Sequence, residues 1–169
     1  MNAVATYTLV TDGACSGNGT DDSRGGWAFI LTDPSGEETV LTGGEFPSTN
    51  NRMELTAVLE GLSATPAGSD VRLITDSSYV AKALTEGWLE GWQRRGWRTA
   101  SKKPVANRDL WERMIQELGR HAAVTPELVR GHAGHPANER ADRLAQDAAV
   151  DPDPAPPRPA DEEQLGLDL

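Results

Sequence analysis

The chain has 169 residues, of which 37% are hydrophobic and 25% charged, and this composition suits one compact domain. No run of about 18 apolar residues could span a bilayer, and the first ten residues lack a secretory pattern. We therefore expect a cytoplasmic protein without a membrane partner. Because Cys15 is the single cysteine, an intramolecular disulfide and a thiolate zinc site are both excluded.

The net charge of -10 argues, taken alone, against a nucleic-acid partner, because phosphate binding draws on Lys and Arg. The charge is unevenly distributed, however. Residues 151–169 contain six acidic side chains and one arginine. Residues 93–108 contain no acidic side chain and six basic ones, which are Arg94, Arg95, Arg98, Lys102, Lys103 and Arg108. This basic arm could contact a polyanion.

Alternating apolar side chains predict three strands in the first third of the chain, at 6–11, 27–32 and 38–43. The first strand is expected to stop at Asp12, and a glycine-rich loop is expected from there to Gly26. The second and third strands are joined by residues 33–36, whose Pro and Gly suit a tight turn. Together these features predict an antiparallel meander.

Helical spacing of apolar residues begins after the meander. Leu55, Val58, Leu59 and Leu62 fall at i, i+3, i+4 and i+7, which predicts a helix over 51–65. Later segments predict strands at 71–75 and 124–129, and helices from Ser77 towards Leu84, at 108–118 and at 136–149.

This order of elements predicts an α/β fold with a mixed five-stranded sheet, three antiparallel strands followed by two parallel ones, flanked by helices. Residues 1–150 are expected to form the domain. Residues 151–169 are rich in proline and acidic side chains, so we expect them to be an extended, disordered tail.

Two aspartates follow similar sequences at the expected ends of strands, Leu-Val-Thr before Asp12 and Leu-Ile-Thr before Asp76. If the strands are parallel neighbours, both carboxylates emerge at the same sheet edge. Glu54 and Asp142, on the helices expected at 51–65 and 136–149, could be packed against that edge. Four carboxylates would raise one another's pKa unless divalent cations neutralise them, and oxygen ligands favour magnesium or manganese.

Each carboxylate also has a simpler interpretation. Asp12 could belong to a turn, Asp76 could cap a helix, Glu54 could be a favourable charge near a helix N-terminus, and Asp142 could lie on a solvated face. For any one isolated residue the simpler interpretation is the commoner one. The four contexts taken together favour a shared site.

Four sequence blocks carry a resemblance to a known family. They are Thr-Asp-Gly-Ala-Cys (11–15), Thr-Asn-Asn-Arg-Met-Glu-Leu (49–55), Thr-Asp-Ser-Ser-Tyr-Val (75–80) and Gly-His-Ala-Gly-His-Pro-Ala-Asn-Glu-Arg-Ala-Asp (131–142). In order and spacing they resemble bacterial ribonuclease HI, over residues 7–149. The resemblance implies a ribonuclease H-like fold and an endonuclease that hydrolyses the RNA strand of RNA/DNA hybrids in replication and repair. It also implies products with 5'-phosphate and 3'-hydroxyl ends. The sequence gives no clear sign of oligomerisation, so we expect a monomer.

The resemblance further implies two magnesium ions per site, with manganese able to substitute, held by Asp12, Glu54, Asp76 and Asp142. It gives a catalytic role to His132, which could move a proton or help product release. A zinc site formed by His132 and His135 is the alternative, and we expect His135 to be structural instead. A catalytically weak hybrid-binding module is the alternative to the enzyme.

Substrate contacts implied by the resemblance fall into two groups. Neutral side chains would read the hybrid, and these are Cys15, Asn18, Thr49, Asn50, Asn51 and Ser78. A basic protrusion over about 88–104 would hold the DNA strand through Trp88, Trp92, Arg94, Arg95, Trp97, Lys102 and Lys103. Asn50 and Asn51 could instead cap a helix. Trp88 and Trp92 are expected to be partly core, and Trp111 to be core.

Two features depart from the family pattern. The loop at 17–26 has extra residues, including Asp21 and Asp22, and Ser78 stands where a longer glutamine is expected. At the other end of the chain, Gln164, Leu165, Leu167 and Leu169 resemble a peptide that binds the bacterial sliding clamp. A plain acidic tail is the alternative there.

Overall fold

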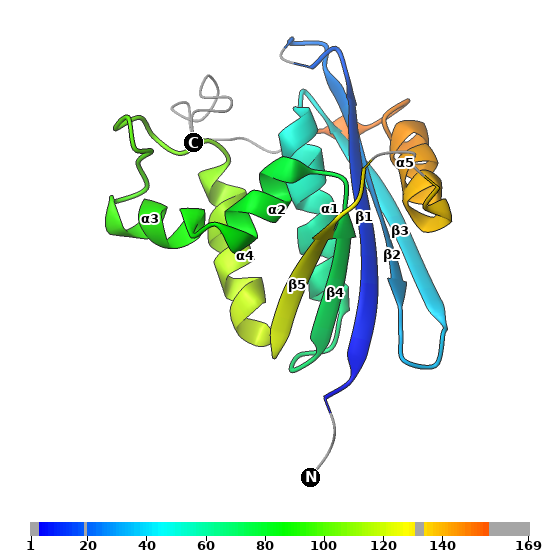
Figure 1. Ribbon diagram of the computed structural model, residues 1–169. Helices are drawn as coiled ribbons and strands as arrows, with labels where there is room; N and C mark the ends of the chain where they lie inside the picture. Colours follow the sequence, from blue (N-terminus) through cyan, green and yellow to red (C-terminus); the bar gives the residue numbers. More distant parts are fainter. Residues whose placement is uncertain (1–3, 19, 131–133, 156–169) are drawn as a thin grey trace.

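The computed structural model describes residues 4–18, 20–130 and 134–155. One twisted sheet lies between helices on its two faces (Figure 1). Helix α1 (Asn50–Ala64) covers one face and α4 (Arg108–Arg120) packs against α1, whereas α5 (Pro136–Ala148) covers the other face. None of the helices in the described residues has the length and apolar character needed to cross a bilayer.

Six strands form the sheet in the order β5-β4-β1-β2-β3-β6. Their bounds are Thr6–Ser16 (β1), Arg24–Thr32 (β2), Glu38–Phe46 (β3), Asp70–Thr75 (β4), Ala123–Leu128 (β5) and Asp153–Pro154 (β6). β1, β2 and β3 are antiparallel neighbours, and β4 and β5 extend the sheet in parallel from β1. The predicted mixed α/β sheet is confirmed.

The prediction of five strands was wrong by one, because β6 lies in the segment expected to be a linker. β6 pairs in parallel with the end of β3, and the N–H of Ala155 donates to the carbonyl of Phe46 at 2.7 Å. Pro154 lacks an N–H, but an edge strand bonds on one side only and tolerates this. Proline content alone therefore did not exclude a strand at the sheet edge.

The helix caps decide several alternatives left open by the sequence. The Thr49 hydroxyl accepts from the backbone N–H of Arg52 at 3.1 Å, so Thr49 caps α1 and Asn50 and Asn51 lie inside the helix. The Ser77 hydroxyl accepts from Val80 and caps α2 (Ser78–Thr85). The capping roles considered for Asn50, Asn51 and Asp76 are therefore wrong.

Alternation along the strands buries both faces of the sheet. Leu9 of β1 belongs to a large apolar cluster with Phe29 and the helices on the α1 side. The next residue, Val10, belongs to a smaller cluster with Ile30 and Ala141 on the α5 side. The central strands are consequently apolar on both faces, as their sequences indicate.

Two glycines allow helices to approach the sheet closely. A Cβ at Gly13 would lie 2.4 Å from the backbone nitrogen of Glu54, and a Cβ at Gly26 would lie 2.1 Å from the carbonyl oxygen of Ala145. Both atoms are backbone and cannot swing away. These glycines therefore set the distances of α1 and α5 from the strands, and with them the heights of Glu54 and Asp142.

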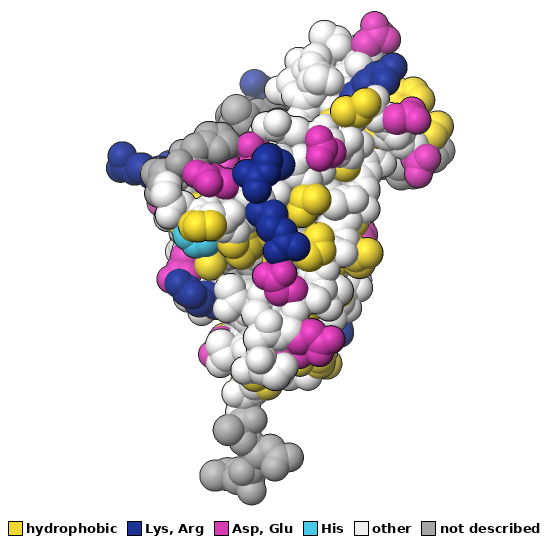
Figure 2. All heavy atoms as spheres, turned by 90° about the vertical axis from the view of Figure 1, so that its right-hand side faces the viewer, with side chains coloured by type: hydrophobic (Ala, Val, Ile, Leu, Met, Phe, Trp, Pro, Cys, Tyr) yellow, Lys and Arg dark blue, Asp and Glu magenta, His cyan; other side chains and the backbone are white. Residues whose placement is uncertain are grey.

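The side of the molecule on which α5 lies carries mixed charges. Basic side chains there are bordered by acidic ones, with hydrophobic side chains between them (Figure 2). Arg140 of α5 forms an exposed ion pair with Glu38 of β3 at 2.7 Å on this side of the sheet. Pairing of this kind leaves little net charge for binding a polyanion.

Candidate active site

Asp12 lies inside β1 and not at its end, which corrects the prediction. The β1–β2 pairing continues to Ser16 and Arg24, whereas the parallel β1–β4 pairing ends at Val10 and Ile74. Beyond that point none of the described strands pairs with β1 on the β4 side. The chain that follows β4 places Asp76 beside Asp12. The prediction that the two aspartates lie together is therefore confirmed, although β1 continues past Asp12.

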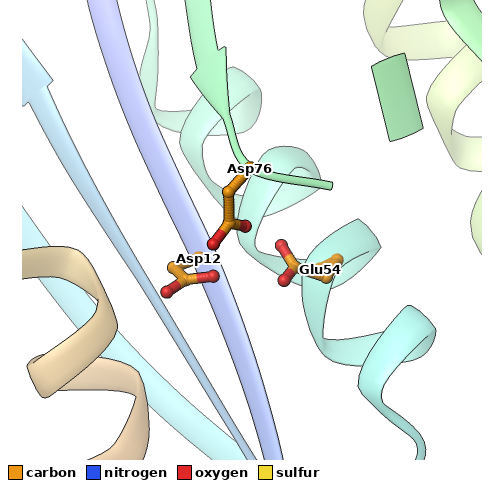
Figure 3. A group of neighbouring side chains, drawn as sticks. All are labelled: Asp12, Glu54 and Asp76. Carbon is orange, nitrogen blue, oxygen red and sulfur yellow. The ribbon is translucent and has the colours of Figure 1, made fainter. Parts of the chain in front are cut away.

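Three carboxylates converge at this point of the sheet. One oxygen each from Asp12, Glu54 and Asp76 lies within 4.8 Å of the others, and Figure 3 shows the side chains pointing toward one another from β1, α1 and the end of β4. Asp12 and Glu54 are 1% and 4% exposed. This burial does not fit a turn residue or a solvated charge at a helix end, which were the simpler interpretations of these two residues.

Asp142 lines the same cleft from the α5 side. Its Oδ2 accepts a hydrogen bond from Nε2 of Gln146, one turn further along α5, at 3.0 Å. The nearby Asp142 carboxyl also raises the pKa of Asp12. The fourth carboxylate is therefore part of the cleft, although it does not belong to the tight group of three.

Burial and mutual repulsion change the acidity of the site. Burial, followed by the charge of Asp76, raises the pKa of Asp12 to about 8, and the N–H of Gly13 offsets this in part by donating to Oδ1 at 2.9 Å. Burial and the charges of Asp12 and Asp76 raise the pKa of Glu54 well above its usual value. Without a neutralising cation, the cluster holds protons at neutral pH.

The cluster fits a divalent cation. Asp12 Oδ2 and Glu54 Oε2 are buried and have no hydrogen-bond partner among the described residues. Buried carboxylate oxygens without a partner are costly unless a cation or proton satisfies them. Because all the donor atoms are oxygens, the set suits magnesium or manganese better than a soft metal.

Comparison with known proteins decides the family. The RNase H family model matches residues 4–150. The chain belongs to the ribonuclease H family. Membership makes it an enzyme of the ribonuclease H class, a nuclease that hydrolyses phosphodiester bonds, as the sequence blocks indicated.

Individual relatives agree with this family. A ribonuclease H of Saccharopolyspora erythraea is 55% identical over 146 residues, which are 86% of this chain and 89% of the relative. The crystal structure of LC9-RNase H1, a type 1 RNase H with the type 2 active-site motif, matches with a TM-score of 0.76 at 32% identity, over 88% of this chain and 74% of that one. A foamy viral protease-reverse transcriptase in complex with RNA/DNA hybrid shares the fold, with a TM-score of 0.67 at 18% identity over 87% of this chain and 20% of that one.

Neutral polar side chains surround the carboxylates of this ribonuclease H. Asn50, Asn51 and Ser78 line the carboxylate cleft, which has a volume of about 420 Å³. A second cleft of about 560 Å³ shares Asn50, Gly13 and Asp142 with the first and continues past Cys15. The two clefts thus form one surface along β1.

Asn18 and Thr49 are held beside these clefts by hydrogen bonds to backbone groups. Asn18 Oδ1 accepts from the N–H of Asn50 at 3.0 Å, and Thr49 is the α1 cap. Each of these two oxygens therefore already accepts one hydrogen bond within the protein. The Asn18 amide nitrogen and the Thr49 hydroxyl hydrogen are the donors still able to contact a substrate.

The basic protrusion begins with α3 (Trp88–Arg94), and an irregular segment follows α3 as far as Asn107. Trp92 is 1% exposed, so its expected contact with substrate is wrong in this conformation. It packs between Trp88, Trp97 and Trp111 because a large aromatic ring gains most from full burial. Trp88 and Trp97 are half-buried. The exposed basic residues of the protrusion are Arg94, Arg95, Arg98, Lys102 and Lys103, of which all but Arg98 were expected to contact substrate.

The predictions that Trp111 is a core residue and that His135 is structural are both confirmed. Trp111 is fully buried and donates through Nε1 to the hydroxyl of Tyr79 at 2.8 Å, as expected of a core residue. His135 Nδ1 accepts from the N–H of Asn138 and caps α5, which is a structural role. His132 and the peptide 164–169 lie outside the described residues.

Sequence reasoning missed three residues around the site, namely Arg24, Arg52 and Gln146. Arg52 stands inside the Asn-Asn-Arg-Met-Glu block, and Gln146 stands four residues after Asp142, so spacing alone could have suggested the second. Arg24 lines the second cleft at the start of β2. Its location depends on how the extended loop before it folds, which no motif indicates.

Proposed function

We propose that this chain is an endonuclease that hydrolyses the RNA strand of RNA/DNA hybrids and leaves 5'-phosphate and 3'-hydroxyl ends. The observation that carries the proposal is the convergence of Asp12, Glu54 and Asp76 in an open cleft of a ribonuclease H fold. The complex of the foamy viral enzyme with RNA/DNA hybrid supports the same substrate class.

Asp12, Glu54, Asp76 and Asp142 are the residues that would hold magnesium, or manganese in its place, with two ions per site. Bound ions of this kind supply Lewis acidity and lower the pKa of water. The protein contributes the fixed carboxylates. Gly13 orients Asp12 through Oδ1, and burial of Glu54 keeps bulk water from competing for its oxygens.

Recognition of the hybrid would use the neutral side chains on the cleft surface. RNA differs from DNA by its 2'-hydroxyl, which both donates and accepts hydrogen bonds. Cys15, Asn18, Asn50, Asn51 and Ser78 offer short polar groups for that purpose, and Thr49 would contact a DNA phosphate. Exposed cations of the basic protrusion would hold the DNA strand beyond the cut, through Arg94, Arg95, Lys102 and Lys103, with Trp88 and Trp97 beside them.

Four further assignments belong to the same proposal. His132 would transfer a proton or help product leave. The protein would act in the cytoplasm as a monomer, in replication and repair. Residues 1–150 would form the catalytic domain, with β6 added at the edge of its sheet. The rest of 151–169 would form a tail whose Gln164, Leu165, Leu167 and Leu169 bind the sliding clamp. A clamp pull-down with the intact chain and with a 164–169 deletion tests the last assignment, since the deletion should abolish capture.

The decisive experiment for the activity uses end-labelled RNA in an RNA/DNA duplex, with RNA/RNA and DNA/DNA duplexes as controls. Wild type is compared with Asp76→Asn, with and without magnesium. We expect cleavage of the hybrid RNA alone, only with magnesium and only by wild type. Hybrid binding without cutting in magnesium or manganese would show a binding module instead, and cutting of DNA would overturn the substrate.

A further inference from the structure

The extended loop at 17–23 is attached at two points to the segment that begins α1. Near its start, Asn18 Oδ1 accepts from the backbone N–H of Asn50. Near its end, the Ser23 hydroxyl donates to the carbonyl of Ser48 at 2.7 Å and accepts from the N–H of Ser48 at 2.8 Å. Ser23 is 1% exposed. The described ends of the loop are therefore held against the same segment that carries Asn50 and Glu54.

Arg24 follows Ser23 directly and lines the second cleft. Its NH1 donates to the carbonyl of Val150 at 2.9 Å, which directs the guanidinium across the cleft toward the end of α5. A guanidinium carries five N–H donors, so one such bond leaves most of them available. Arg24 is otherwise exposed to solvent.

Arg24 has a distinctive place in the electrostatics of this cleft. Among the described residues that line it, Arg24 is the one cation and Asp142 the one carboxylate. Asp21 and Asp22 lie three and two residues before Arg24 and are exposed. A nucleic-acid strand that follows the cleft away from the carboxylates would meet unfavourable charge unless a cation faced it.

We propose that Arg24 binds a phosphate of the strand that is cut, further along that strand than the scissile phosphate. The two clefts share Gly13, Asn50 and Asp142, so a strand with its scissile phosphate at the carboxylates continues over Cys15 to Arg24. The inference rests on the proposed function for its substrate. Arg24 makes up for the acidic residues of the extended loop and adds a contact separate from the basic protrusion.

The test measures the affinity for a short RNA/DNA hybrid at several salt concentrations, in the non-cleaving Asp76→Asn background. Adding Arg24→Ala should weaken binding about 3- to 10-fold at low salt and reduce the slope of log affinity against log salt by about one. Arg24→Lys should keep most of the slope, because it keeps the charge. Arg140→Ala, which removes an exposed arginine of α5 paired with Glu38, is the matched control and should change neither.

A chemically modified substrate makes the assignment specific. A neutral methylphosphonate is placed at one RNA position at a time near the cut. At one of these positions the methylphosphonate should weaken binding to the Asp76→Asn protein, which retains Arg24. The same methylphosphonate should change binding little when Arg24→Ala is added, because the contact is already lost. Additive losses at every position would overturn the proposal, as would an unchanged salt slope.

Arg24 could instead merely fasten the start of β2 to the end of α5. In that case Arg24→Ala would lower the melting temperature and leave the salt slope as it was, and this result would contradict the proposal. The outcome is also distinct from failure of the proposed function. If wild type does not cut the hybrid, the proposed activity is contradicted. If wild type cuts the hybrid but Arg24→Ala leaves the salt slope unchanged, only the proposed role of Arg24 is contradicted.

Discussion

Arg52 of α1 holds Asp109 of α4 in a two-pronged ion pair. NH1 and NH2 of the guanidinium donate to the two carboxylate oxygens at 3.0 and 2.9 Å. The Arg52 side chain is 4% exposed, and it also contacts Glu45 and Asn107. Burial opposes the charged form, but the hydrogen bonds and charge of Asp109 outweigh it and raise the pKa of Arg52. Glu54 lies two residues further along α1, so this pair ties the helical turn that carries Glu54 to α4.

Replacing Asp109 by Ala should destabilise the protein by about 1–3 kcal/mol, because a buried guanidinium loses its main partner. Urea denaturation measures this loss. The matched control is Glu127→Ala, which breaks the pair with Arg72 between β5 and β4, where both side chains are about half exposed. That change should cost less than about 1 kcal/mol. Equal losses in the two variants would show that the Arg52 pair adds no more than a surface pair.

The sequence was sufficient to predict most of the fold and the four carboxylates. Among the described residues, periodicity located every helix except α3 and every strand except β6, because apolar spacing depends on which faces are buried. The matching sequences before Asp12 and Asp76 indicated parallel neighbours that meet at one place, and β1 and β4 are such neighbours. These inferences rely on local pattern, which a sequence displays directly.

What could not be predicted depends on contacts between distant residues. β1 continues past Asp12 because β2 pairs with it as far as Arg24, and the end of a strand is decided by its partner. Trp92 is buried by Trp111, and Arg52 binds Asp109 on another helix. No spacing rule links such residues. The sequence therefore predicted that Trp92 would contact substrate in part, whereas in the structure Trp92 lies entirely in the core.

The buried carboxylates should make the metal-free protein lose stability as pH rises. Asp12 has an ordinary pKa of 3.8 and a pKa of about 8 in the fold, so between these values the folded protein binds more protons than the unfolded chain. The free energy of unfolding therefore falls across that range, and Glu54 acts in the same direction. Asp12→Asn removes much of this penalty. Without metal it should be more stable than wild type, by a margin that grows from pH 5 to about 1–4 kcal/mol at pH 8.

Urea titrations of both proteins at pH 5, 6.5 and 8, in a chelator, measure this margin. Repeating them in magnesium provides the control, because a cation that binds only the folded wild type should narrow the difference. A margin that shrinks toward pH 8 without metal would contradict the raised pKa of Asp12.

Gln146 should act as a positioning residue for Asp142. Its Nε2 holds Asp142 Oδ2 at 3.0 Å across one turn of α5. Gln146→Ala should lower the rate of hybrid cleavage about 2- to 10-fold and raise the magnesium concentration needed for half-maximal rate, with little change in melting temperature. Gln146→Glu should be worse, because it places a second negative charge beside Asp142. Identical magnesium curves for wild type and Gln146→Ala would rule the role out.

Gly26 should tolerate no side chain, because α5 lies directly on it. A Cβ there would meet Ala145 O at 2.1 Å and the backbone nitrogen of Ala149 at 2.5 Å, so α5 would have to move away from β2. Gly26→Ala should cost about 2–4 kcal/mol in the free energy of unfolding. It should also reduce cleavage, because the displaced helix carries Asp142. Gly119→Ala in α4 is the matched control, since nothing lies within 4 Å of its Cβ, and there alanine should be neutral or stabilise by up to about 1 kcal/mol. A well-folded Gly26→Ala protein with full activity would show that the close packing of α5 does not set the position of Asp142.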